Sequence, residues 1–225
     1  MHRNFIVRFW CSILLLFIAG IGLLFFHSIP FKIFYCLTSF VASIELFSFF
    51  FKKKSFFHFV LLALELILLI LGTIFIIQSN NTTIILLLIG VCSYDIFAYL
   101  FGRGIDGYFF PYSHPFPHIS KNKTWEGTIM GLISSFTIIN LSLLITHNYS
   151  FIFLLAGPFA LIGDLSESLL KRYFSIKDSN EIIIKKPGFA FIELLVGGKE
   201  GHGGYLDRID SIAFTATIFL ILSIL

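Results

Sequence analysis

Charged residues are scarce in this chain, and their scarcity excludes an ordinary soluble domain. Only 13% of the 225 residues are Asp, Glu, Lys or Arg, whereas 57% are hydrophobic. In a soluble domain roughly a quarter of all residues are charged. The sequence therefore predicts an integral membrane protein, organised as a single membrane-embedded domain over residues 1–225.

Several common functional signatures are missing as well. The three cysteines, Cys11, Cys36 and Cys92, lie in apolar runs without a Cys-x-x-Cys pair or a Cys/His cluster, so neither a disulfide framework nor a zinc site is indicated. There is no Walker A motif and no Gly-x-Gly-x-x-Gly motif. No cleavage site follows the first apolar run, so that run is expected to be a helix and not a signal peptide. No nucleic-acid partner is expected.

What the chain does contain is a series of long apolar runs. Each is long enough, or nearly so, to cross a hydrocarbon core of about 30 Å at about 1.5 Å per residue. They predict an all-α, polytopic fold of about seven transmembrane helices. The expected helices are residues 8–26, 31–51, 57–78, 83–101, 128–147, 150–170 and 210–225. Residues 1–82 hold the N-terminal spans, and 83–225 form a core that carries the motifs described below.

The distribution of basic residues predicts the orientation. With the N-terminus in the cytoplasm, 15 of the 16 Lys and Arg residues fall in cytoplasmic segments, and only Lys32 falls outside. Cytoplasmic loops are the ones that carry an excess of Lys and Arg. The long polar loops, and any polar substrate, are therefore expected on the cytoplasmic side.

Four acidic residues lie inside predicted spans. Glu45, Glu65, Asp95 and Asp164 sit at a similar depth, roughly 9–12 Å from the cytoplasmic end at helical rise. A carboxylate within a span is costly and indicates function by default. We expect the four to share a water-filled cavity that opens to the cytoplasm. The alternative, which applies most to Glu45 and Glu65, is that they are protonated or hydrated near the interface.

The most polar stretch begins at Asp164. Asp164, Glu167 and Lys171 are spaced three and four apart, so they share one face of a predicted helix. The simpler interpretation is a local ion pair at a helix end. Further charges follow at Arg172, Lys177 and Asp178. Paired carboxylates beside cations suit a polyphosphate bound through Mg²⁺, which takes one or two carboxylates together with phosphate oxygens.

A second charged motif follows a glycine-rich turn. The glycines at 201, 203 and 204 would let the backbone approach a ligand, and successive N–H groups could cradle an anion. Asp207, Arg208 and Asp210 come directly afterwards, at the start of the last predicted span. Upstream, Lys121 and Lys123 could contact phosphate or lipid headgroups, and Trp125 could instead be an interfacial anchor.

Together these motifs resemble the phosphatidate cytidylyltransferases, also called CDP-diacylglycerol synthases. The family signature appears in order at Ser168, Lys171–Arg172, Lys177–Asp178, His202–Gly203–Gly204 and Leu206–Asp210. Gly163–Ser168, Lys123–Gly127 and Asp95–Arg103 also look like the family. The resemblance covers about half of the chain, from Asp95 onward, while the earlier spans match only in hydropathy.

The resemblance implies that CTP and phosphatidate react to give CDP-diacylglycerol and pyrophosphate in phospholipid biosynthesis. Mg²⁺, alone or with a second cation, would be the cofactor. The implied metal ligands are Asp164 and Asp207, with Glu167, Asp178 and Asp210 as secondary ligands or orienting groups. Phosphates would be held by Lys171, Arg172, Lys177 and Arg208, and the nucleotide pocket would include Lys123, His202, Gly203 and Gly204. Membrane lipids, a homodimer and the bacterial inner membrane are the implied surroundings.

One departure from the family pattern keeps alternatives open. In the family only a few residues separate the Lys-Asp and His-Gly-Gly motifs, but here 23 residues lie between Asp178 and His202, including an apparent insert at 189–201. The enzymatic alternative is a related CTP-dependent enzyme that acts on another lipid, such as a polyprenol kinase or an archaeal-type lipid cytidylyltransferase. An inactive paralogue or a transporter are the non-enzymatic alternatives.

Overall fold

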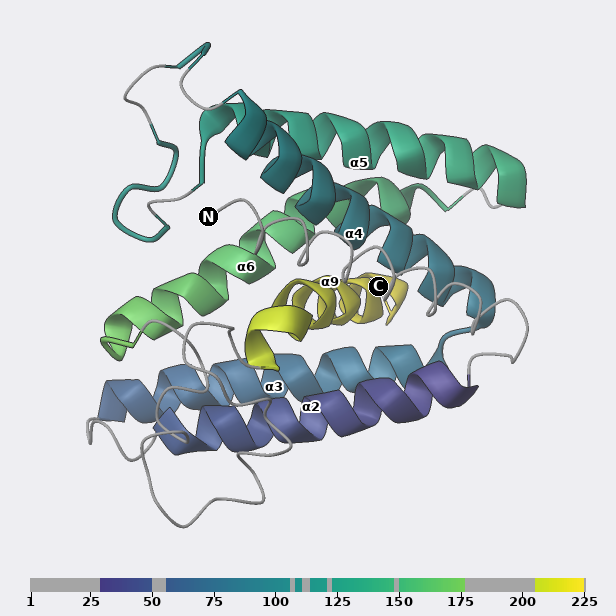
Figure 1. The fold of residues 1–225 in the computed structure, drawn as a ribbon. Helices are drawn as coiled ribbons and strands as arrows, with labels where there is room; N and C mark the ends of the chain where they lie inside the picture. The colour runs from purple at the N-terminus through teal and green to yellow at the C-terminus, as the bar shows by residue number, and fades with distance from the viewer. Residues whose placement is uncertain are drawn as a thin grey trace.

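The computed structural model describes residues 29–49, 56–105, 108–110, 114–120, 123–147, 150–176 and 205–224. Within these ranges the regular structure is helical and no strand is present, so the predicted all-α class is confirmed. The elements are α2 (Ile29–Phe49), α3 (Phe56–Gln78), α4 (Asn81–Gly104), α5 (Trp125–Thr146), the 3₁₀ helix η1 (Phe151–Leu155), α6 (Ala156–Tyr173) and α9 (Leu206–Ile224) (Figure 1).

The helices agree with six of the predicted spans to within a few residues. In the described part of the chain, five are long and apolar enough to cross a membrane, with η1 and α6 together forming the fifth, Phe151–Tyr173. The chain is therefore a polytopic membrane protein. Helix α9 is 19 residues long but carries three charged residues near its start. The span predicted at 8–26 and the apparent insert at 189–201 lie outside the described residues, so the total of seven helices stays a prediction.

Large hydrophobic side chains point outward from the bundle. Phe40 on α2, Phe59 on α3 and Leu144 on α5 are 66%, 58% and 68% exposed. Apolar surface on this scale is unfavourable in water and is what helices in contact with lipid require.

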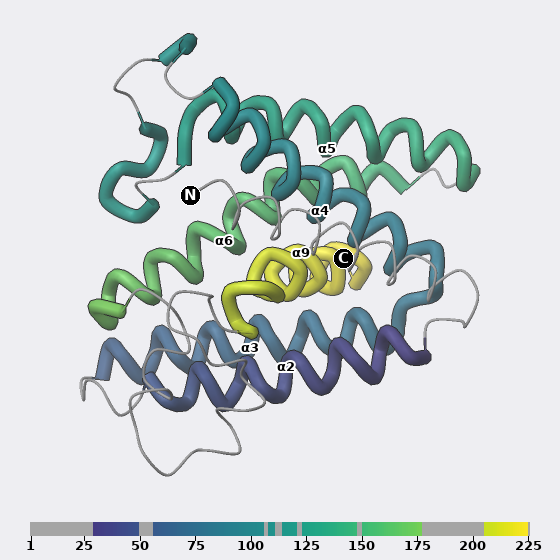
Figure 2. The backbone as a smooth tube through the Cα atoms, viewed as in Figure 1, coloured from purple at the N-terminus to yellow at the C-terminus, as the bar shows by residue number. Residues whose placement is uncertain are grey.

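Helix α9 lies at the centre of the arrangement. It runs between the α2–α3 pair on one side and α4 and α6 on the other, with α5 beyond α4 (Figures 1 and 2). Two glycines allow close approach: a Cβ on Gly72 of α3 would lie 2.6 Å from the Ala213 carbonyl oxygen, and one on Gly163 of α6 would lie 2.9 Å from Ser211 Cα. Small residues at such positions let helix backbones pack closely in membranes. Helix α9 is therefore held against both neighbours.

Helices α4 and α5 are joined by the same kind of contact. A Cβ on Gly127 of α5 would lie 2.8 Å from Gly102 Cα on α4. Thr124 caps α5, because its side-chain oxygen accepts a hydrogen bond from Gly127 N–H at 3.1 Å. Gly127 and Thr124 belong to one motif, and Gly102 belongs to another. Part of the family resemblance is therefore a requirement of helix packing and capping.

The helix directions collect the charged motifs at one end of the bundle. Helices α4 and α6 end there, and α5 and α9 begin there (Figure 1). Lys32 lies at the opposite end, where its ammonium donates to the Ile77 carbonyl oxygen at 2.8 Å, at the end of α3. The separation of Lys32 from the charged motifs agrees with the pattern on which the predicted orientation rests.

Candidate active site

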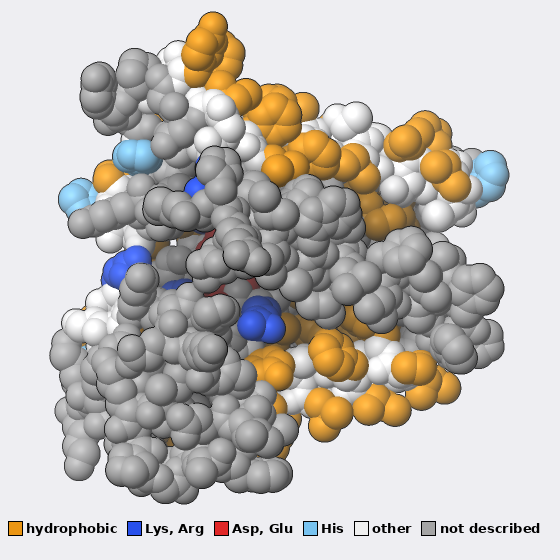
Figure 3. Space-filling view, in the orientation of Figure 1, with side chains coloured by type: hydrophobic (Ala, Val, Ile, Leu, Met, Phe, Trp, Pro, Cys, Tyr) orange, Lys and Arg blue, Asp and Glu red, His pale blue; other side chains and the backbone are white. Residues whose placement is uncertain are grey.

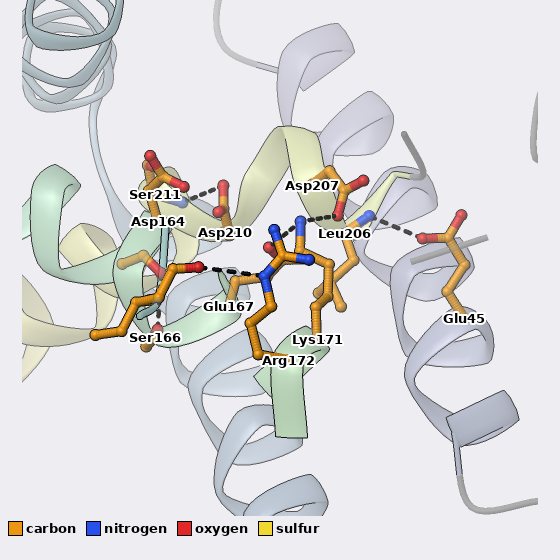
Figure 4. Close-up of polar contacts among 12 residues, drawn as sticks. Glu45, Asp164, Ser166, Glu167, Lys171, Arg172, Leu206, Asp207, Asp210 and Ser211 are labelled. Carbon is orange, nitrogen blue, oxygen red and sulfur yellow. Dashed lines mark hydrogen bonds and ion pairs between the residues drawn. The ribbon is translucent and has the colours of Figure 1, made fainter. Parts of the chain in front are cut away.

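The first cluster of the site joins α6 and α9 through one lysine. Lys171 Nζ lies 2.6 Å from Glu167 Oε2 on its own helix and 3.0 Å from Asp207 Oδ1 on α9 (Figure 4). The Glu167 side chain is only 1% exposed. The local ion pair considered above therefore exists, but it extends to a carboxylate 36 residues further along the chain. We call Glu167, Lys171 and Asp207 the Lys171 cluster.

The second cluster lies at the start of α5. Lys123 Nζ is 2.5 Å from Asp164 Oδ2, and it lies 5.7 Å from the centre of the Tyr94 ring, within reach of a cation–π contact. The Asp164 side chain is 36% exposed, far more than Glu167. We call Lys123 and Asp164 the Lys123 pair.

A cavity of about 620 Å³ opens beside the Lys123 pair. Its walls come from α4, α5, α6 and the loop before α5, and they include Tyr94, Asp95, Arg103, His114, Lys123 and Asp164. Pockets for small molecules usually have volumes of about 300–1,000 Å³ and a few well-placed polar groups. This cavity has both carboxylates and cations on its walls, which suits a charged ligand that includes phosphate groups.

The predicted shared cavity was right for two of the four acids within spans and wrong for the other two. Asp95 and Asp164 line the 620 Å³ cavity. Glu45 and Glu65 are not among its lining residues and are buried, at 0% and 7% exposure. The reason is the position of α9, which lies between the cavity helices and the α2–α3 pair that carries these two glutamates (Figure 1).

Asp210 extends the acidic group beside the cavity. It is buried and lies near Asp164 (Figure 4), and it is near enough to both Asp164 and Asp95 for electrostatic interaction. Its Oδ1 accepts a hydrogen bond from the Ser211 N–H at 2.7 Å. In Figure 3, the red acidic atoms that can be seen lie in the interior between the two groups of helices, with Lys and Arg atoms close to them. Several carboxylates close together favour a bound cation, whether ammonium or metal.

The two predicted arginines lie outside the Lys171 cluster. Arg172 Nε donates to the Ile119 carbonyl oxygen at 3.3 Å and so ties the end of α6 to the loop before α5. The exposed Arg208 lies over the Tyr205 ring, at 5.8 Å from its centre. Lys177, Asp178, His202, Gly203 and Gly204 were also predicted for the site and lie outside the described residues.

One acid has a place that the sequence reasoning did not give it, and another was left out of the predicted site residues. Asp95 was expected to line a cavity, and does so, but it was not named as a site residue. Glu126 is buried, and its Oε1 accepts hydrogen bonds from the N–H groups of Phe109 and Phe110 at 3.1 and 3.0 Å. Glu126 thereby holds the loop between α4 and α5 next to the cavity. Its position in the Lys123–Gly127 motif was the available signal.

The carboxylates fit a hard divalent cation of the kind that arrives with a nucleotide. The described ranges contain no group of three or more His, Cys, Asp or Glu residues arranged to hold a metal ion by themselves. Glu167 and Asp207 nevertheless converge on the positive charge of Lys171, and Asp164 contacts that of Lys123. Mg²⁺ is usually bound by one or two carboxylates with phosphate oxygens and water completing its octahedral shell. The donor set is therefore suited to a hard divalent cation bound together with a polyphosphate.

Comparison with known proteins points to one family. The model of the cytidylyltransferase family matches residues 5–189. The chain is 36% identical over 135 residues to chloroplastic phosphatidate cytidylyltransferase 4 of Arabidopsis thaliana, covering 57% of this chain and 29% of that protein. It is 35% identical over 147 residues to the phosphatidate cytidylyltransferase of Rickettsia felis, covering 60% and 56% of the two chains.

A third relative, the phosphatidate cytidylyltransferase of Staphylococcus saprophyticus, is 35% identical over 137 residues, covering 58% of this chain and 44% of its own. The matches span little more than half the length of these curated relatives, or less. The family model, in contrast, covers most of the chain, including Lys123, Asp164, Glu167 and Lys171. With its motifs gathered at one end of a helical membrane bundle, the chain belongs to the cytidylyltransferase family.

Proposed function

We propose that this chain transfers the cytidylyl group of CTP to phosphatidate, forming CDP-diacylglycerol and releasing pyrophosphate. A phosphate oxygen of phosphatidate bonds to the α-phosphorus of CTP, and the bond from that phosphorus to the oxygen of the leaving pyrophosphate breaks. The observation that carries the proposal is the meeting of Lys171 with Glu167 and Asp207, beside the Lys123–Asp164 pair. The names of the relatives support the choice of nucleotide and lipid.

The reaction requires management of charge more than a general base. A phosphate monoester has a second pKa of about 6, so phosphatidate is mostly dianionic at neutral pH and is already a nucleophile. The barrier consists of repulsion between two anions and of alignment for in-line attack. Cations held near carboxylates reduce the repulsion between the anions, and their fixed positions help to align the reactants. A site of this kind works without a Ser-His-Asp arrangement.

In this proposal each group of residues has a distinct task. Asp164 and Asp207 would hold Mg²⁺, and Glu167, Asp178 and Asp210 would complete or orient that ligand set. When bound, Mg²⁺ neutralises phosphate charge and makes the α-phosphorus a better electrophile. Lys123 and Lys171 transfer their hydrogen bonds from carboxylates to phosphate oxygens. The remaining proposed ligands of phosphates and nucleotide are Arg172, Lys177, His202, Gly203, Gly204 and Arg208.

The surroundings of the reaction belong to the same proposal. The acyl chains of phosphatidate stay in the bilayer against the apolar outer surfaces of the helices, while CTP enters the cavity from the cytoplasm. The basic residues at the active-site end support this orientation, because cytoplasmic segments are rich in Lys and Arg. A bacterial inner membrane and a homodimer complete the proposal. Light scattering of the detergent-solubilised protein would test the homodimer.

The decisive experiment follows each phosphate of CTP separately. Membranes containing the protein are incubated with phosphatidate, Mg²⁺ and CTP labelled at either the α- or the γ-phosphate, with and without EDTA. We expect Mg²⁺-dependent transfer of the α-label to lipid and release of the γ-label as pyrophosphate. Transfer of the γ-label to a lipid would instead identify a kinase. No labelled lipid from well-inserted protein would contradict the proposal, and polyprenol and ether-lipid phosphates would then be tested as acceptors.

A further inference from the structure

Glu45 connects the N-terminal spans to the start of α9. It lies on α2 and is completely buried, at 0% exposure. Its Oε1 accepts a hydrogen bond from the Tyr205 N–H at 3.0 Å. Its Oε2 accepts one from the Leu206 N–H, also at 3.0 Å (Figure 4). These N–H groups stand at the beginning of a helix, where the backbone has no acceptor within the helix itself. A side chain more than 150 positions away in the sequence supplies the acceptors.

The chemistry of this contact favours an ionised carboxylate. Burying a carboxylate is costly unless hydrogen bonds and opposite charge compensate it. The start of a helix carries partial positive charge, and bonds from N–H groups to a charged acceptor are shorter and stronger than bonds between neutral groups. The two carboxylate oxygens of Glu45 accept from the N–H groups of two consecutive residues, so the contact restrains the direction of the chain as well as its position.

We propose that Glu45 is a positioning residue of the active site, which sets the first turn of α9 so that Asp207 meets Lys171. Asp207 directly follows Leu206, whose N–H Glu45 holds. The Arg208 N–H in turn donates to the Tyr205 carbonyl oxygen at 3.1 Å, which closes the same turn. The glycine contacts of α9 with α3 and α6 fix its sides, whereas Glu45 fixes its beginning.

The inference gives the N-terminal spans a part in catalysis. The family model includes nearly all of residues 1–82, but none of the charged motifs of the site lies there, and these spans could have served as a membrane anchor alone. Through Glu45, α2 instead controls the placement of a proposed metal ligand. Misplacement of a reacting group by about 1 Å can reduce a rate by about 10²-fold. The effect on turnover rests on the proposed function, whereas the effect on the first turn of α9 does not.

The test compares Glu45→Gln and Glu45→Asp with a matched control, Glu65→Gln. Glu65 is a second buried glutamate, located on α3, that the structure does not place at the start of α9. Hydrogen exchange of the 205–210 backbone is measured by mass spectrometry on the full-length protein in detergent without substrate. The kcat and the KM for CTP are measured in parallel.

We expect Glu45→Gln to speed exchange in 205–210 about tenfold or more, because a glutamine offers one acceptor oxygen where two are needed. The kcat should fall by about 10–100-fold while the KM for CTP changes little. Glu45→Asp should recover part of the loss, since its carboxylate keeps two oxygens. Glu65→Gln should leave both measurements near the wild-type values.

Three outcomes would overturn the inference: unchanged exchange in 205–210, an equal rise in exchange along the whole chain, or the same response from Glu65→Gln. A misfolded variant is recognised by the second of these. If the wild-type protein makes no CDP-lipid, the proposed function fails, but the exchange measurement still decides whether Glu45 positions α9. If the wild-type protein is active and Glu45→Gln is equally active, the inference about Glu45 fails alone.

Discussion

The Lys171 cluster and the Lys123 pair use the same kinds of charge in different surroundings. Lys171 is enclosed between α6 and α9 and touches two carboxylates, one of them almost completely buried. Lys123 lies before α5, touches one partly exposed carboxylate and lines a cavity. Breaking a buried pair leaves an uncompensated charge, whereas a pair that solvent reaches contributes less to stability. The two lysines are equally buried, so the difference lies in their carboxylates. The first cluster therefore joins two helices in addition to its proposed part in the reaction, whereas the second can exchange its carboxylate for a ligand at less cost to the fold.

The largest effect should come from removing a carboxylate of either cluster. Asp207→Asn and Asp164→Asn should each lower turnover by about 10²–10³-fold or more, because a neutral amide is a poor ligand for Mg²⁺ and stabilises less charge. Insertion into the membrane should be unchanged, because asparagine can still accept a hydrogen bond from the lysine. The measurement is labelled CDP-lipid per unit of inserted protein. Turnover near the wild-type value in either variant would contradict the metal-ligand proposal for that residue.

Replacing each lysine should show that the two clusters contribute differently to the stability of the protein. Lys171→Met should reduce the free energy of unfolding by about 3–5 kcal/mol, since Glu167 and Asp207 would face one another without their shared cation. Lys123→Met should reduce it by about 1 kcal/mol or less. Thermal unfolding in detergent, with both variants in the same buffer, gives the comparison. Equal losses would mean that the two lysines have the same structural importance.

The Lys123 variant should instead reveal its effect in nucleotide binding. A hydrogen bond to a charged group contributes about 1.5–3 kcal/mol, so Lys123→Met should raise the KM for CTP by about tenfold or more. Lys123→Arg keeps the charge and serves as the matched control. Initial rates over a range of CTP concentrations at saturating phosphatidate would measure the effect. A KM that does not change in Lys123→Met would remove this residue from the proposed CTP site.

The smallest effect should come from the loop beside the Lys123 pair. Glu126→Gln keeps an oxygen for the Phe109 and Phe110 N–H groups but loses the charge, so the local stability should fall by about 1 kcal/mol. Hydrogen exchange should rise in residues 108–110 and stay unchanged in 205–210. Faster exchange in both segments would show that the loop beside the Lys123 pair and the Lys171 cluster are coupled and do not respond independently.

The sequence predicted the parts of this molecule that depend on local pattern. Apolar runs placed six helices to within a few residues, and the spacing of Asp164, Glu167 and Lys171 placed them on one helix face. The sequence did not predict the contacts between helices that are far apart along the chain. Nothing in the hydropathy of α2 indicates that Glu45 reaches α9, and the similar depth of four acids suggested one cavity where α9 keeps them apart. The depth of a residue in the membrane can be counted along its own helix. The arrangement of the helices around α9 depends on contacts between segments that are far apart in the sequence.

The central position of α9 has a consequence for how the protein is made. This helix follows α2, α3, α4, α5 and α6 in the chain, yet it lies among them. During synthesis the earlier helices enter the membrane first, so Glu45 waits without the N–H groups of Tyr205 and Leu206, whereas Glu167 already has Lys171 on its own helix. A carboxylate left unpaired in the bilayer is unfavourable, and the arrival of α9 supplies the missing donors to Glu45. The completion of the active site and the final stabilisation of the bundle are therefore the same event in biogenesis.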